Sequence, residues 1–255
     1  MAERTVQWTP GPLLELDVSA VSEQGNRPSN QDAVVWHLQS GQFVGVVADG
    51  AGGHRGGEVA SRLIIESTLQ HLHSLHALPA QAALRTWLED CNQQILNQQA
   101  LNPALSDMHS TACLLVIDVH CRSAAWVHVG DTRLYQGRAG RMVFRTRDHS
   151  VLQWQADHPG NWPSVGRNTL YSALGQPTKD MVCQVDACIS PLQAGDWFAL
   201  CSDGVWEQVT DDEMAAIVAC TASAQEAVMH LHAVARKRAA GRADNMTTLL
   251  VRLLA

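Results

Sequence analysis

The chain has 255 residues, of which 46% are hydrophobic, and its formal net charge at pH 7 is −7. This apolar fraction is enough for a substantial core, built as one large domain or two ordinary ones. The acidic excess and the lack of Lys/Arg clusters argue against a nucleic-acid partner. The sequence has no signal-peptide pattern and no apolar run long enough to cross a bilayer, so we expect a cytoplasmic protein with no membrane partner.

In chain order, the first 13 residues are expected to form a flexible arm. Short β-branched runs then predict strands, and longer patterns with apolar residues at helical spacing predict helices. The segments TDDE and SAQE open two of the helices with N-terminal signals, the second in the form of a capping box. Strands are predicted at residues 14–21, 33–38, 43–48, 111–119, 124–129, 141–145, 181–187, 197–201 and 246–254, and helices at 57–75, 80–97, 211–220 and 223–238.

This element order groups strands into hairpins and helices into pairs, without a strict βαβ alternation. It favours an α+β fold in which two sheets are covered by helix pairs. No internal repeat and no linker divides the sequence, so residues 14–255 are expected to form a single domain. The seven cysteines form no Cys-x-x-Cys pair and several lie in apolar runs, which predicts buried, reduced thiols.

A glycine-rich loop, ADGAGGHRGGEVA, spans residues 48–60 directly behind a predicted strand. So many glycines raise the entropy lost on folding, so the loop should serve something other than stability. It could cradle a phosphate, but the spacings typical of nucleotide loops are absent. Alternatively, it could let Asp49 and the next carbonyl group, that of Gly50, reach a metal ion, which would need further ligands elsewhere.

Acidic residues at predicted strand boundaries supply candidates for those ligands. A hard cation prefers carboxylate oxygens, and strand ends are rigid places from which to aim them. Each Asp alone is typical of an ordinary turn residue, but their recurrence in apolar contexts predicts a shared site. The candidates are Asp32, Asp49, Asp131, Asp203 and Asp244.

At these residues the sequence resembles the metal-dependent type 2C Ser/Thr protein phosphatases, in particular their bacterial branch. The resemblance implies a four-layer αββα sandwich with two central, mainly antiparallel sheets flanked by helix pairs. It covers most of the chain and is carried by SEQGNRPSNQDA (22–33), VVADGAGGHRGGEVAS (46–61), STA (110–112), VGDTRLY (129–135), RDHS (147–150), ALG (173–175), LCSDGVWE (200–207) and DNMTTLLV (244–251).

The resemblance also implies a centre of two Mn²⁺ or Mg²⁺ ions and allows a third, weaker one. Asp49 would bridge the two ions, with the Gly50 carbonyl as a further ligand. Asp203 and Asp244 would hold one ion, and Asp131 would share the third with Asp203. Asp32 would lie near the site, through water.

Two more residues have roles implied by the resemblance. Arg27 would grip the substrate phosphate with its planar fork, although a solvated surface arginine is the alternative. His54 would protonate the departing seryl or threonyl oxygen, whereas its rival role is a turn histidine that packs the glycine-rich loop. The flap at residues 151–168 is shorter than in many relatives, and its Trp154 and Trp162 are expected to form a substrate rim. His109 stands where relatives usually have glycine.

The predicted function is hydrolysis of phosphoserine and phosphothreonine in proteins by in-line attack of a metal-bridging water, without a covalent phosphoenzyme. Such an enzyme, expected to be a monomer, would oppose a Ser/Thr kinase in bacterial signalling. Two alternatives remain open. One is a non-catalytic member of the fold that binds phosphoproteins, and the other is a two-metal hydrolase of another phosphoester.

Overall fold

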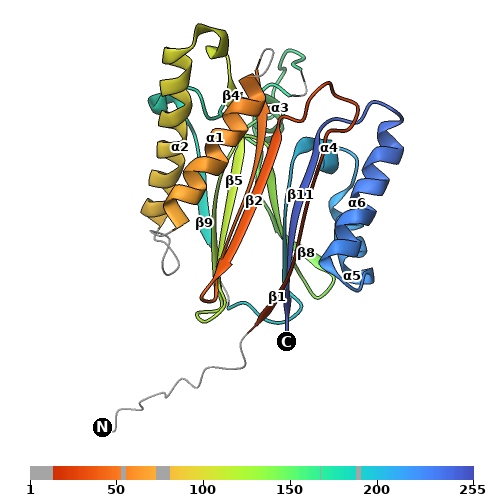
Figure 1. Ribbon diagram of the computed structural model, residues 1–255. Helices are drawn as coiled ribbons and strands as arrows, with labels where there is room; N and C mark the ends of the chain where they lie inside the picture. The colour runs from red at the N-terminus through yellow and green to blue at the C-terminus, as the bar shows by residue number, and fades with distance from the viewer. Residues whose placement is uncertain (1–13, 53–55, 73–80, 167, 188–190) are drawn as a thin grey trace.

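The computed structural model describes residues 14–52, 56–72, 81–166, 168–187 and 191–255. Two antiparallel sheets form its centre (Figure 1). The first has the order β1-β11-β10-β7-β8, and the second has the order β2-β3-β5-β6-β9 with β4 paired to β3. The strands of the first are β1 (Glu15–Glu23), β7 (Arg133–Arg138), β8 (Arg141–Arg145), β10 (Trp197–Cys201) and β11 (Met246–Leu254). Those of the second are β2 (Asp32–Gln39), β3 (Gln42–Ala51), β4 (His109–Ser110), β5 (Ala112–Asp118), β6 (Ser123–Val129) and β9 (Gln184–Ala187).

Helix pairs cover the outer faces of both sheets (Figure 1). The pair α1 (Gly56–His71) and α2 (Gln81–Leu101) packs on the second sheet, and α5 (Asp211–Cys220) with α6 (Ala224–Ala239) packs on the first. Short helices α3 (Val151–Asp157) and α4 (Asp203–Trp206) lie at one end of the sandwich, with 3₁₀ turns η2 (Pro103–Leu105) and η3 (Thr178–Asp180) elsewhere. The predicted four-layer fold is confirmed.

Strand β5 shows why the central strands read as continuous apolar runs. Leu114 and Val116 pack toward α1 and α2, whereas Leu115 and Ile117 join the core between the two sheets. Because successive side chains of a strand point to opposite faces, a strand buried on both faces has no polar alternation. The sheets therefore form a rigid support for the loops at their ends.

The sequence predictions differ from the structure mainly in short elements. Strand β7 and helices α3 and α4 are missing from them, because segments of four to seven residues carry too little periodicity. The strand predicted at 181–187 begins only at Gln184. Helix α5 has the bounds predicted for it, and Thr210 forms a capping box with Glu213 there.

The cysteine prediction is only partly right. Cys91, Cys113 and Cys201 are buried and unpaired, but Cys121 and Cys220 are exposed, in the turn after β5 and at the end of α5. Of the helices within the described ranges, none is both long and apolar enough to span a bilayer.

Candidate metal centre

Two cavities that share lining residues lie at the end of the sandwich near β4 and α4. The first has a volume of about 270 Å³ and is lined in part by Asp49, Asp131 and Asp203. The second, about 350 Å³, is lined in part by Arg27, Asp49, Asp203 and Asp244. Asp49 and Asp203 therefore face both cavities, with Asp131 on one side and Asp244 on the other.

The pairing of β2 with β3 places the first two carboxylates. Asp32 begins β2 and lies directly opposite Asp49, near the end of β3. The backbone carbonyl of Asp49 accepts hydrogen bonds from the Thr111 N–H and the Ser110 hydroxyl, both at 2.8 Å. Asp32 is buried, and its Oδ2 accepts a hydrogen bond from the Ser202 hydroxyl at 2.7 Å. The segment STA thus fixes the backbone that carries Asp49.

A close backbone approach brings Asp203 and Asp244 together. Asp203 is the first residue of α4, and Asp244 lies two residues before β11. A Cβ atom on Gly204 would lie 2.1 Å from the carbonyl oxygen of Asn245, so only glycine fits between these segments. The Asp-Gly pair after β10 therefore serves this approach as well as turn formation.

The glycine-rich loop joins β3 to α1 through a similar approach. A Cβ atom on Gly50 would lie 2.0 Å from the carbonyl oxygen of Gly57, and one on Gly57 would lie 2.6 Å from the carbonyl oxygen of Gly50. The glycines at these two positions let the helix start directly against the strand end. His54 lies outside the described residues, so its predicted role stays a prediction.

Burial raises the pKa of four carboxyl groups at or behind the cavities. The pKa values of Asp32 and Asp131 rise to about 6, and those of Asp49 and Asp203 rise well above the ordinary range. Burial is the main cause in all four, and repulsion between neighbouring carboxylates adds to it. The charged carboxylates are therefore disfavoured on their own, and bound cations would offset this cost and favour them.

The side-chain donors at the site are mainly carboxylate oxygens. Oxygen ligands suit Mg²⁺ and Mn²⁺, and one oxygen of Asp32 is buried without a hydrogen-bond partner among the described residues. Within the described ranges, no three Asp, Glu, His or Cys side chains already converge as a metal-binding group. The carboxylates surround the cavities instead, which fits cations that keep several of their waters.

Arg27 reaches the site but contacts a carboxylate. Its exposed guanidinium lines the second cavity and forms an ion pair with Asp244, and this hydrogen bond raises the pKa of Arg27. The contact places a positive charge on one of the predicted metal ligands. Arg27 thus lines the same cavity as Asp49, Asp203 and Asp244, and its contact with a substrate phosphate stays a prediction.

Asn168 is a cavity residue that sequence reasoning missed. Its side chain is exposed, lines both cavities, and donates a long hydrogen bond of 3.4 Å to Oδ2 of Asp203. No local pattern distinguishes it from other polar residues of the flap. His109 is also exposed and lines the first cavity, where its ring Nδ1 lies 2.7 Å from the Asp107 carbonyl oxygen.

The two flap tryptophans lie outside the cavities. Trp154 in α3 and Trp162 beyond it are 39% and 45% exposed, and their rings meet edge to face at a centroid distance of 5.0 Å. Neither is among the described residues that line the two cavities. The predicted rim is therefore an exposed aromatic pair, and its contact with substrates stays a prediction.

Comparisons with known proteins identify the family of the chain and its fold. Residues 22–250 match the protein phosphatase 2C family. The serine/threonine phosphatase stp of Listeria welshimeri is 30% identical over 236 residues, which are 88% of this chain and 90% of that protein. Among solved structures, PppA of Pseudomonas aeruginosa is 30% identical with a TM-score of 0.74, over 95% of this chain and 99% of that one.

A second solved structure carries metal. It is the catalytic domain of the serine/threonine protein phosphatase PstP in complex with two manganese ions, 25% identical with a TM-score of 0.78, over 95% of this chain and all of that one. The family match spans most of the chain, and the fold matches throughout. The chain belongs to the protein phosphatase 2C family, in its bacterial branch.

Proposed function

We propose that the chain hydrolyses phosphoserine and phosphothreonine in proteins with the help of two Mn²⁺ or Mg²⁺ ions. The observation that carries the proposal is the shared position of Asp49 and Asp203 on both cavities, with Asp131 and Asp244 on either side. Residues 14–255 would act as one catalytic domain, with the short flap at 151–168 beside it.

The carboxylates would bind the ions as the family resemblance implies. Asp49 would bridge them, and the Gly50 carbonyl would be a further ligand. Asp203 and Asp244 would hold one ion, and Asp131 would share a third, weaker ion with Asp203. When bound, such ions supply a nucleophile from water near neutral pH and neutralise charge on the phosphoryl group. Asp32 would contact the ions only through water, because it is buried and accepts a hydrogen bond from Ser202.

Arg27 would bind the substrate phosphate. In the structure its guanidinium pairs with Asp244. Once Asp244 engages a cation, the guanidinium is free to take two phosphate oxygens with its planar fork. Arg27 would thus exchange a carboxylate for a phosphate within the same cavity.

His54 would be the general acid that protonates the departing oxygen, since the ordinary pKa of histidine suits that role. Its alternative role is to pack the glycine-rich loop. Replacing His54 with Gln separates the two roles. If His54 is the general acid, the variant loses activity and its pH–rate profile changes. If His54 only packs the loop, the variant mainly changes stability. The reaction needs no cysteine or serine nucleophile, so rapid quenching should find no phosphorylated enzyme.

The partners would be phosphorylated proteins and a Ser/Thr kinase whose action the chain reverses in the bacterial cytoplasm. Relatives named serine/threonine phosphatases in bacteria support this class of substrate. We propose that it acts as a monomer.

Two rival functions make different predictions about substrates. A phosphoprotein-binding member of the fold would bind phosphopeptides without turnover, but the intact set of carboxylates around the cavities argues against it. A hydrolase of another phosphoester would prefer a nucleotide. A panel of phosphothreonine peptide, phosphoserine peptide and ATP with Mn²⁺ tests all three, and we expect turnover of the peptides alone. Turnover of ATP alone, or tight peptide binding without turnover, would contradict the proposal.

A further inference from the structure

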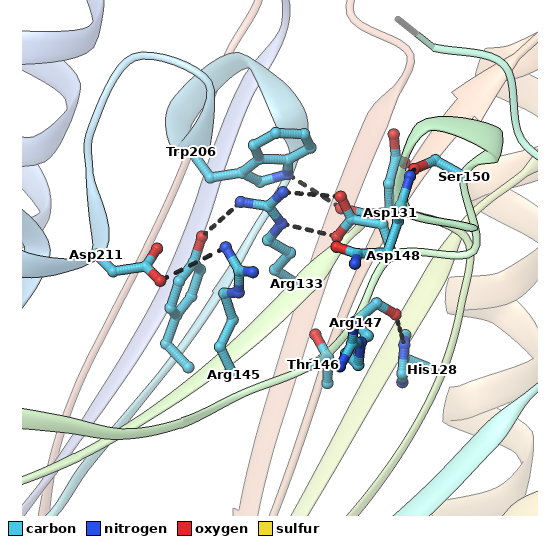
Figure 2. A network of polar contacts seen from close by, with 12 residues as sticks. His128, Asp131, Arg133, Arg145, Thr146, Arg147, Asp148, Ser150, Trp206 and Asp211 are labelled. Carbon is cyan, nitrogen blue, oxygen red and sulfur yellow. Dashed lines mark hydrogen bonds and ion pairs between the residues drawn. The ribbon is translucent and has the colours of Figure 1, made fainter. Parts of the chain in front are cut away.

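A buried ion pair lies directly beside Asp131. Arg133 on β7 donates two parallel hydrogen bonds to the carboxylate of Asp148, from Nε to Oδ1 and from a terminal nitrogen to Oδ2, both at 2.7 Å (Figure 2). The two side chains are only 12% and 8% exposed. This bidentate geometry occupies the guanidinium fork and fixes its plane.

Trp206 holds the other side of the guanidinium. The Arg133 guanidinium carbon lies 3.5 Å from the centre of the Trp206 ring, and the ring Nε1–H donates to the backbone carbonyl of Asp131 at 3.0 Å (Figure 2). Trp206 ends α4, the helix that Asp203 begins. One short helix therefore connects Asp203 to the turn that carries Asp131, with Arg133 packed between.

Arg133 has a second carboxylate in its neighbourhood. Trp206 contacts both residues, because its ring covers the Arg133 guanidinium and its Nε1–H donates to the Asp131 carbonyl. Arg133 lies only two residues beyond Asp131 and has a long, flexible side chain. Without Asp148, the guanidinium would lose its bidentate partner while Asp131 stands two residues away along the chain.

We propose that Asp148 is a positioning residue for the metal centre: by holding Arg133 against Trp206, it keeps the guanidinium off Asp131 and leaves that carboxylate for the cation shared with Asp203. This inference rests on the metal centre proposed above. The ion pair would then keep the Asp131 carboxylate available as a metal ligand, in addition to any contribution to stability.

The proposal predicts that breaking the pair from its two sides has different effects. In Asp148→Asn, Arg133 turns to Asp131 and competes with the cation. In Arg133→Met, no such competitor exists, and Asp148 adds negative charge near the site. If the pair served only stability, Asp148→Asn and Arg133→Met would lower the metal affinity of the protein equally.

The chain offers a matched control on the same strand. Arg138, at the other end of β7, forms an equivalent bidentate pair with Asp196, with distances of 2.6 and 2.7 Å. The Asp196 side chain is fully buried. Asp196 is not among the described residues that line either metal cavity. Asp196→Asn therefore breaks a similar buried pair away from the site.

The experiment titrates wild type and the variants with Mn²⁺ in the absence of substrate and counts free Mn²⁺ by electron paramagnetic resonance. We expect Asp148→Asn to weaken the weakest Mn²⁺ site about tenfold or more, the size typical of losing a group that supports a ligand. Arg133→Met, the double variant Arg133→Met/Asp148→Asn and Asp196→Asn should all keep wild-type affinity or exceed it.

Equal loss in Asp148→Asn and Arg133→Met would overturn the inference, and so would wild-type binding by a folded Asp148→Asn. Should Asp148→Asn fail to fold, the double variant decides, because it lacks both charges: retained affinity supports the inference and loss overturns it. A wild type that binds no Mn²⁺ would refute the metal centre itself and this inference with it.

Discussion

Asp32 and Asp49 lie directly opposite each other on β2 and β3, so one strand pair delivers two carboxylates to the same end of the sandwich. Asp32 is 8% exposed, and its Oδ2 accepts a hydrogen bond from Ser202. Burial raises its pKa to about 6. In the absence of metal, ionising the buried Asp32 beside Asp49 therefore lowers the free energy of unfolding.

Asp32→Asn should therefore stabilise the metal-free protein at high pH. The folded pKa of about 6 exceeds the ordinary Asp pKa of 3.8, so this group lowers the free energy of unfolding as pH rises from about 4 through 6. The shift corresponds to at most about 3 kcal/mol at pH 8. Urea unfolding in EDTA at pH 4.5 and 8 measures the effect, and a difference between variant and wild type that is the same at both pH values would contradict it.

His149 should make the protein sensitive to acid. Its ring stacks on His128 at a centroid distance of 4.7 Å, and its Nδ1 accepts a hydrogen bond from the Gly130 N–H at 3.1 Å. Burial lowers the pKa of His149 from 6.5 to about 3. The unfolded chain thus binds the proton first, so stability is present above pH 6.5 and falls as pH drops toward 3.

The variant His149→Asn keeps a side-chain acceptor for Gly130 but does not titrate. Between pH 7.5 and 5 we expect wild type to lose about 2 kcal/mol more of its unfolding free energy than this variant does. Guanidinium unfolding at the two pH values measures the difference. Parallel losses in both proteins would show that His149 does not carry the acid sensitivity.

Much of this fold follows from the sequence, because central strands such as β5 and β11 are long apolar runs and α5 begins at a clear cap. The candidate carboxylates could also be found, because each stands at a strand boundary. The short helix α4 could not be predicted, since four residues have no detectable period. The contacts of Trp206 with Asp131 and Arg133 depend on where α4 lies, so they could not be predicted either.

The prediction for Arg27 follows from its position at the second cavity. Arg27→Ala removes a charge-assisted fork that is worth about 2 kcal/mol, so KM for a phosphopeptide should rise roughly tenfold or more. Stability should change little, because the side chain is exposed and exposed pairs contribute little. Mn²⁺ affinity should not fall, since the variant frees Asp244. Steady-state kinetics and Mn²⁺ titration measure both quantities, with Arg27→Lys as the variant that keeps the charge without the fork.

Unchanged KM in Arg27→Ala would remove this residue from phosphate binding. Reduced Mn²⁺ affinity would instead mean that the ion pair with Asp244 supports the metal site.

The exposed pair Trp154 and Trp162 should affect only large substrates. Replacing both with Ala should lower kcat/KM for a phosphoprotein several-fold, because exposed aromatic side chains supply contact area at low entropic cost. Turnover of a small aryl phosphate should not change, since neither ring lines the cavities. Trp36→Ala serves as the control, because Trp36 is 43% exposed on β2. Equal effects on both substrates would contradict the rim.

The proposed activity depends on divalent cations bound by the carboxylates around Asp49 and Asp203. The most direct test measures hydrolysis of a phosphothreonine peptide by wild type and Asp203→Asn in EDTA, Mg²⁺ or Mn²⁺. The exposed Asp212→Asn at the start of α5 is the control. We predict that wild type and Asp212→Asn need metal and that Asp203→Asn loses activity by two orders of magnitude or more, roughly the loss of one electrostatic partner of the reaction. Hydrolysis in EDTA, or wild-type activity in Asp203→Asn, would contradict the account.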